Sequence, residues 1–264
     1  MNNYILGAIA GDVIGSVFEW DNVKTTNFPL FRSRSSFTDD TVLTVATMDA
    51  IINKKDYTKV YQSYGRRYPM RGYGGNFKKW LITPRPKPYN SWGNGSAMRV
   101  SPIGWAFDTI EEVLGEAKKS AEVTHNHPEG IKGAQAVSAA IFLARTGESK
   151  RAIKTYIETM FDYDLDRTIE DIRPDYTFDV SCQGSVPESI IAFLESTDYE
   201  STIRLAISIG GDSDTIACIA GSIAQAFYKE IPNEIVVDTM LKLPGDMVKV
   251  VREFSALYNA RMSE

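Results

Sequence analysis

The stretch that decides the fold is residues 5–18, with the sequence ILGAIAGDVIGSVF. Its apolar side chains return every fourth residue at Ile5, Ile9, Val13 and Val17. This period is typical of an amphipathic helix, whereas a half-buried strand would alternate polar and apolar residues. We therefore expect a helix at the beginning of the chain.

The same period recurs farther along the chain, at residues 42–52, 131–142, 216–227 and 247–257. Strict alternation of polar and apolar residues is nearly absent, so the pattern predicts a mostly or wholly α fold. A chain of 264 residues lies near the upper limit for one hydrophobic core. We expect a compact, single-domain orthogonal helical bundle that spans residues 1–264.

Small residues repeat on two of these helical faces. Gly7, Gly11 and Gly15 lie in the first face, and Ala217 and Gly221 lie in a late one. Glycine inside a helix costs about 1 kcal/mol relative to alanine, so its repetition needs a reason. We expect helices that approach closely near the centre of the fold, with ordinary tight packing as the alternative at each position.

Composition excludes several classes of function. The net charge of -5 is spread along the chain, and no basic block favours nucleic acid or an anionic membrane as a partner. Cys182 and Cys218 belong to no CxxC or Cys/His cluster, which argues against a thiolate zinc site and fits a reducing compartment. No apolar run is long enough to span a bilayer, and the start resembles no signal peptide. We expect a cytoplasmic protein.

Two segments differ from the helical pattern. Residues 68–92 are rich in Gly, Pro and Arg, and residues 162–186 also lack a clear period. Both are expected to be irregular, and long loops of this kind are commonly functional or mobile.

Two short acidic motifs carry unusual chemistry: SFTDDT at 36–41 and GGDSDT at 210–215. Each directly precedes an expected helix, one starting near Val42 and the other near Ile216. Helix capping explains one Asp or Thr per helix, but less readily two acids and a threonine at both places. If the helix starts face each other, four carboxylates share a small volume and raise one another's pKa unless cations neutralise them.

Hard divalent ions such as Mg²⁺ or Mn²⁺ prefer such oxygen ligands, and two of them can polarise a shared water. Spacing alone leaves metal binding and capping equally open. The order Asp212-Ser213-Asp214-Thr215 also fits the D-x-D-x-T pattern of phosphotransferases with an aspartyl nucleophile. That chemistry needs a preceding buried strand, for which residues 206–209 are the candidate, but the strand/helix alternation of such folds is missing.

Five motifs follow one another along most of the chain. They are Gly11-Asp12-x-x-Gly15-x-x-x-Glu19, Thr38-Asp39-Asp40-Thr41, Gly93-Asn94-Gly95-Ser96-Ala97-Met98-Arg99, Thr124-His125 and Gly210-Gly211-Asp212-Ser213-Asp214-Thr215. In this order they resemble the ADP-ribosylglycohydrolases, the family of the dinitrogenase reductase-activating glycohydrolase and the ADP-ribosyl-acceptor hydrolases. Each motif is weakly specific, but the five in order are a strong signal.

The resemblance implies an all-α fold with a dinuclear Mg²⁺ or Mn²⁺ site at helix N-termini. It implies the metal ligands Thr38, Asp39, Asp40, Asp212, Asp214 and Thr215. It also implies cleavage of the bond between C1″ of ADP-ribose and an acceptor such as a modified arginine or serine. The partners would then be an ADP-ribosylated protein or a small ADP-ribosyl conjugate, with ADP-ribose as product.

The resemblance also implies roles for single residues. Glu19 would lie near the metals and gate the site, and Asp39 or Asp40 would position or deprotonate the attacking water. Asn94, Gly95 and Ser96 would surround the ribose and phosphates, although Asn94-Gly95 is also an ordinary turn dipeptide. His125 would line the ligand cleft, although a lone histidine is more often structural.

Further positions remain candidates without a specific role. Asp12 is either a polar anchor near the site or a hydrogen-bonding group inside the bundle, and Arg99 is expected to pair with buried carboxylates or carbonyls. Tyr73, Trp92 and Tyr176 are candidates for stacking on adenine.

Two other functions stay open. One is a non-catalytic descendant that binds ADP-ribose or has a structural role. The other is a dinuclear-metal hydrolase that acts on a different nucleotide glycoside or ester. The acceptor is also open between arginine, serine, a nucleobase and a metabolite, since the segment 68–92 has no pattern that selects one.

Overall fold

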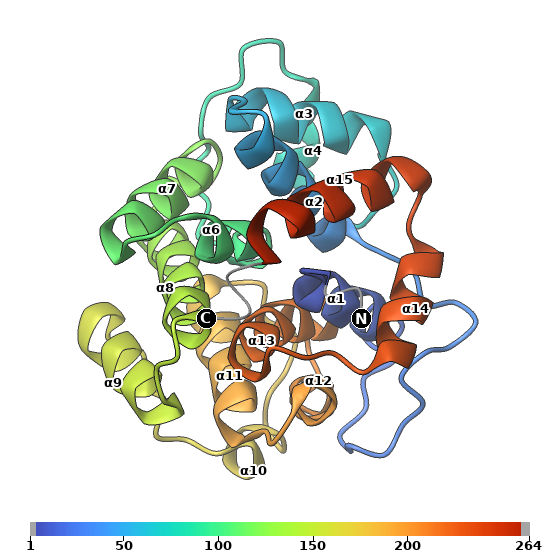
Figure 1. The fold of residues 1–264 in the computed structure, drawn as a ribbon, viewed down its shortest axis with the longest axis vertical. Coiled ribbons are helices and arrows are strands. Elements are labelled where there is room, and N and C mark those ends of the chain that lie inside the picture. Colours follow the sequence, from blue (N-terminus) through green and yellow to red (C-terminus); the bar gives the residue numbers. More distant parts are fainter. Residues whose placement is uncertain (1–3, 260–264) are drawn as a thin grey trace.

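The computed structural model describes residues 4–259, and over this range the chain forms fifteen helices and no strand. The all-α prediction is therefore confirmed (Figure 1). In chain order the helices are α1 (Gly7–Gly15), α2 (Asp39–Ile52), α3 (Tyr57–Arg67), α4 (Gly75–Ile82), α5 (Gly95–Met98), α6 (Ser101–Ala106), α7 (Ile110–Glu122), α8 (Pro128–Arg145), α9 (Lys150–Phe161), α10 (Ile169–Ile172), α11 (Cys182–Glu195), α12 (Tyr199–Ser208), α13 (Ser213–Tyr228), α14 (Asn233–Lys242) and α15 (Gly245–Tyr258). Residues 1–3 and 260–264 lie outside the described range, so the extent of the predicted domain stays a prediction.

Helices α1 and α13 form the centre of the molecule, with the other helices arranged around them (Figure 1). All nine residues of α1 are buried, and α13 is buried from its start to Ala226. A helix that is covered on every side has no polar face to turn to water. The apolar side chains of both helices belong to one continuous hydrophobic core shared with the surrounding helices.

Three glycines of α1 lie directly against α13. A Cβ atom on Gly11 would lie 2.1 Å from the carbonyl oxygen of Ala217, and one on Gly15 would lie 2.5 Å from Cα of Asp214. Both distances are far below the roughly 3.5 Å at which non-bonded carbon atoms meet. The predicted close approach of helices is confirmed, and it fixes the end of α1 beside the start of α13.

The helix boundaries correct several predictions. Helix α2 begins at Asp39 and α13 at Ser213, three residues earlier than expected in each case, because the acidic motifs themselves form the first turns. The segment 68–92 contains α4, whose Phe77 and Trp80 are buried; its short apolar face is hidden in the sequence among Gly, Pro and Arg. The segment 162–186 contains α10 and the first turn of α11.

Residues 206–209, considered above as a strand, lie at the end of α12 and in its C-cap. The aspartyl phosphotransferase alternative is therefore wrong, because no strand leads into Asp212. Cys182 and Cys218 are both buried and free of disulfides. In the part of the chain that the structure describes, no helix has the length and apolar character needed to cross a membrane.

Candidate functional site

Asp12 of α1 caps the beginning of α2. Its Oδ2 accepts hydrogen bonds from the backbone N–H groups of Thr38 and Thr41, each at 3.0 Å, and from the Thr41 hydroxyl. Its Oδ1 accepts from the Thr38 hydroxyl at 2.7 Å. Because Asp12 and Thr38 satisfy the first turn of α2, neither Asp39 nor Asp40 is needed as its cap.

At the start of α13 the N-cap residue does not use its carboxylate as a cap. Asp212 occupies the N-cap position, but its side chain makes no capping hydrogen bond. Instead its Oδ2 accepts from the side-chain amide of Asn94 at 2.7 Å. The Thr215 hydroxyl donates to Oδ1 of Asp40 at 3.3 Å, across 175 positions of sequence. Asp214 Oδ1 accepts from the N–H of Thr215 at 3.0 Å. The two acidic motifs therefore face each other, and N-capping does not explain the carboxylates of Asp39, Asp40 and Asp212.

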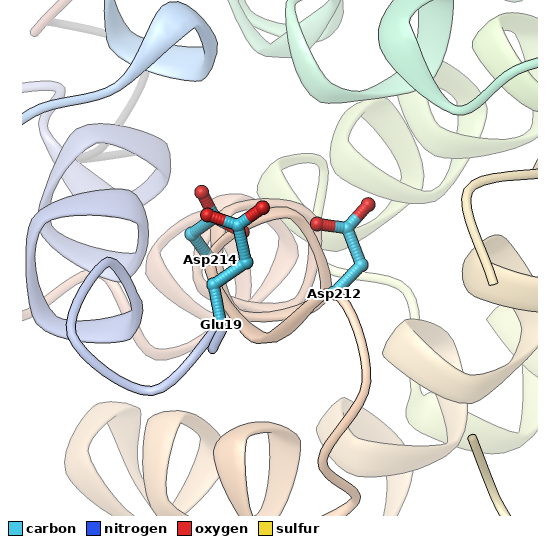
Figure 2. A group of neighbouring side chains, drawn as sticks. All are labelled: Glu19, Asp212 and Asp214. Carbon is cyan, nitrogen blue, oxygen red and sulfur yellow. The ribbon is translucent and has the colours of Figure 1, made fainter. Parts of the chain in front are cut away.

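Three carboxylates converge above the start of α13. Glu19, Asp212 and Asp214 each place one oxygen within 4.8 Å of the other two. Figure 2 shows Glu19 and Asp214 side by side, with the carboxylate of Asp212 turned towards them. Asp39 and Asp40 line the same cavity, and Oδ2 of Asp40 is buried without a hydrogen-bond partner among the described residues. Such a set of oxygen donors is able to hold divalent cations.

The acids destabilise one another's charged forms. Burial, followed by the charges of Asp12 and Asp39, raises the pKa of Asp40 well above its ordinary value. Burial, followed by the charge of Asp212, does the same for the pKa of Asp214. Burial and then Asp212 raise the pKa of Glu19 to about 7. A bound cation would remove this penalty, so the donor set fits hard divalent metals.

The carboxylates lie in a cavity of about 460 Å³, a volume in the range of small-molecule sites. Most residues singled out from the sequence line it: Glu19, Thr38, Asp39, Asp40, Asn94, Gly95, His125, Asp212, Asp214 and Thr215. Ser96, which the resemblance placed around the ribose and phosphates, does not line it. Its fully buried hydroxyl donates to the carbonyl of Gly130 at 2.6 Å, so it is directed into the packing against α8.

The profile of the ADP-ribosylglycohydrolases matches residues 3–262 of the sequence. The chain belongs to this family. The ADP-ribosylhydrolase ARH3 of Gallus gallus is 28% identical to it, with 86% of this chain and 84% of the relative covered. The human ADP-ribosylhydrolase ARH3 is 27% identical, with 85% and 84% covered.

A solved structure described as "ADP-ribosylglycohydrolase-related protein complex" superposes with a TM-score of 0.72 at 21% identity. It covers 97% of this chain and 98% of its own, and it shows that the fold is shared. Membership of the family supports ADP-ribosyl hydrolase activity in general. Both acidic motifs lie within the matched residues and line one cavity.

The aromatic residues at the cavity of this ADP-ribosylglycohydrolase are not those selected from the sequence. Tyr73, Trp92 and Tyr176 do not line it; Tyr73, for example, is buried against Phe77. Trp20 and Phe178 line it instead, with stacked rings whose centroids are 5.2 Å apart. Trp20 directly follows Glu19, and this position is the one sequence feature that could have indicated its place at the cavity.

The loop that carries Glu19 is tied to the segment before α13. The side-chain amide of Asn22 donates to the carbonyl of Gly211 at 3.1 Å and accepts from its N–H at 2.8 Å. The Lys24 ammonium donates to the carbonyls of Arg173, Tyr176 and Ile209 at 2.8, 2.8 and 2.6 Å. Asn22 and Lys24 thus hold the Glu19 loop beside Asp212.

Replacing Lys24 by methionine is therefore expected to lower kcat/KM for an ADP-ribosylated substrate about fivefold, or ~1 kcal/mol, because the Glu19 loop loses a charged anchor. Steady-state kinetics measure the effect. Lys249→Met, which removes an exposed lysine of α15, is the matched control and should match the wild type. Equal kinetics for both variants would contradict a positioning role for Lys24.

The metal-free protein is expected to lose stability as the pH rises from about 5 to about 8. The pKa of Glu19 rises from 4.5 to about 7 on folding, through burial and then through Asp212. The folded chain therefore holds the Glu19 proton more tightly than the unfolded chain does. The resulting contribution to folding stability is full below pH 4.5 and is lost as the pH rises through about 7. Thermal unfolding in chelator tests this. A Tm that increases over this window would contradict it, and Mn²⁺ should remove the decrease.

Proposed function

We propose that the chain is a metal-dependent ADP-ribosyl-acceptor hydrolase, which cleaves the bond between C1″ of ADP-ribose and its acceptor. The observation that carries the proposal is the contact between Thr215 and Asp40, because it joins both acidic motifs in one cavity. Similarity to the ARH3 hydrolases over most of the chain supports the same function.

The proposed metal ligands are Thr38, Asp39, Asp40, Asp212, Asp214 and Thr215, with Glu19 beside them. All of these donors are oxygens, which suits Mg²⁺ or Mn²⁺ better than metals that prefer sulfur or nitrogen. Two bound cations would supply Lewis-acid stabilisation for the distal ribose and for the water that attacks it.

The residues around the donors hold them in place. Asp12 orients the Thr38 hydroxyl through a hydrogen bond of 2.7 Å, and Asn94 orients the Asp212 carboxylate through another of the same length. Asp39 or Asp40 would take the proton of the attacking water as general base. The sugar passes through a transition state of oxocarbenium character, in which a nearby cluster of carboxylates is favourable.

The proposed substrate is a protein carrying ADP-ribose on arginine or serine, or a small ADP-ribosyl conjugate, and ADP-ribose is the product.

A panel of arginine-linked and serine-linked peptides and ADP-ribosyl nucleosides, each assayed with Mg²⁺ and with Mn²⁺, tests the proposal. Release of ADP-ribose from at least one class is expected. Binding of ADP-ribose without cleavage of any conjugate would instead identify a non-catalytic binder. Turnover of substrates that lack the distal ribose linkage would identify a different dinuclear hydrolase.

A further inference from the structure

Three buried side chains form a hydrogen-bonded relay at the wall of the cavity. Nη2 of Arg99 lies 2.9 Å from the Thr124 hydroxyl oxygen, and that oxygen lies 2.7 Å from Nδ1 of His125. Arg99 and Thr124 are fully buried, and His125 nearly so. Water therefore has little access to these contacts, and their donors and acceptors must match one another.

Arg99 is fixed as the donor at one end of the relay. The same Nη2 also donates to the carbonyl of Ser120 at 2.8 Å, and the guanidinium carbon lies 4.3 Å from the ring centroid of Tyr61. A guanidinium has hydrogens to donate but no lone pair that accepts. Thr124 must therefore use a lone pair of its hydroxyl oxygen to accept from Arg99.

Among the hydrogen bonds of residues 4–259, the hydroxyl hydrogen of Thr124 then has one acceptor, which is Nδ1 of His125. In the opposite arrangement, Nδ1 would donate to Thr124, and the hydroxyl hydrogen would have no acceptor at a fully buried position. Burial and the nearby Arg99 charge lower the pKa of His125 well below its ordinary value, so the ring is neutral. A neutral imidazole that accepts at Nδ1 carries its hydrogen on Nε2.

The Nε2 atom faces Gly95 and Gly93, two residues that carry no side chain. A Cβ atom on Gly95 would lie 3.2 Å from Nε2, and one on Gly93 would lie 3.7 Å from it. His125 lines the cavity, and within residues 4–259 Nε2 is bonded to no other group. The two glycines thus leave room for a ligand atom in front of the ring nitrogen.

We propose that Arg99 and Thr124 are positioning residues that fix His125 as the Nε2–H tautomer, so that His125 donates a hydrogen bond to the ligand. The ligand atom at this position is then an acceptor, such as a hydroxyl or phosphate oxygen of the ADP-ribosyl group. A neutral ring of this kind does not protonate the leaving acceptor, so His125 is a binding group. The identity of the ligand rests on the proposed function, whereas the tautomer does not.

Imidazole ¹⁵N NMR of the metal-free full-length protein at neutral pH tests the tautomer without any substrate. The chain has two histidines, His125 and His127. The His127→Asn variant leaves only the signals of His125 and so assigns them. We expect His125 to show a protonated Nε2 and an unprotonated, hydrogen-bonded Nδ1. A proton on Nδ1 in the wild type, alone or together with Nε2, would overturn the proposal, and this result does not depend on the folding of any variant of the relay.

Variants of Thr124 test the relay itself. Thr124→Val removes the hydroxyl at similar volume and should give mixed tautomers and about tenfold weaker ADP-ribose binding by calorimetry, or ~1.4 kcal/mol. Thr124→Ser keeps the hydroxyl and should retain the wild-type tautomer and affinity. An unchanged tautomer in Thr124→Val would contradict the relay. If the proposed function failed instead, the wild-type protein would show the Nε2–H tautomer but would not hydrolyse any conjugate.

Discussion

Replacing Asp40 by asparagine is expected to lower hydrolysis by about a thousandfold or more, about 4 kcal/mol in the activation barrier, while stabilising the metal-free protein. Oδ2 of Asp40 has no hydrogen-bond partner among residues 4–259, and burial, followed by the charges of Asp12 and Asp39, opposes ionisation of this carboxyl. Asparagine keeps an oxygen to accept from Thr215 but removes the charge that a cation needs. Single-turnover release of ADP-ribose and thermal unfolding in chelator measure the two effects.

Asp49→Asn is the matched control for this experiment. Asp49 is a buried acid of the same helix, but it pairs with Lys55 at 2.9 Å and does not line the cavity. Its substitution should leave hydrolysis within about twofold of the wild type, since a neutral side chain there changes nothing at the donor set. Equal loss of activity in the Asp40 and Asp49 variants would mean that the effect is structural.

Replacing Gly11 by alanine should destabilise the protein by about 3 kcal/mol and weaken metal binding. The new methyl group would lie 2.1 Å from the Ala217 carbonyl oxygen, so α1 must move away from α13. These helices carry Asp12 and Asp214, and their separation would displace the capped start of α2 from the start of α13. Urea unfolding and Mn²⁺ titration measure the two consequences.

Gly115→Ala in α7 provides the comparison. Apart from its chain neighbours and the nearby backbone of α7, no atom lies within 4 Å of the Cβ position of Gly115. Alanine should therefore raise the free energy of unfolding by about 0.5–1 kcal/mol through its higher helix propensity. The two substitutions are chemically identical and differ only in what the methyl group meets. A Gly11→Ala protein as stable as Gly115→Ala would refute the close contact between α1 and α13.

The fold class was predictable because the helical period at residues 5–18 and at four later places is local information. The two acidic clusters and their suitability for divalent cations were also predictable, because each cluster is a short local motif. The resemblance implied that both clusters belong to one site, but no sequence pattern indicated that the Asp12 side chain of α1 caps α2 through space. Asp12 and Thr38 cap α2, so the carboxylates of Asp39 and Asp40 are free of that role.

The individual ligand contacts were harder to predict, since they depend on side-chain direction. Ser96 lies in a motif of the family, yet its hydroxyl bonds to Gly130 because α8 presents a carbonyl to it. Trp20 and Phe178 meet at the cavity from segments about 160 positions apart, and no spacing rule joins them. His125 was a candidate from its motif, but its proton position became clear only from its contact with Thr124 and, beyond it, Arg99.

Release of ADP-ribose before and after removal of divalent cations tests the central claim most directly. The wild-type protein should release ADP-ribose from an ADP-ribosylated peptide or nucleoside, lose this activity in chelator, and regain it when Mg²⁺ or Mn²⁺ is restored. The Asp214→Asn protein should remain inactive throughout. Hydrolysis that continues in chelator, or equal hydrolysis by Asp214→Asn, would contradict a metal-dependent reaction at the joined acidic motifs.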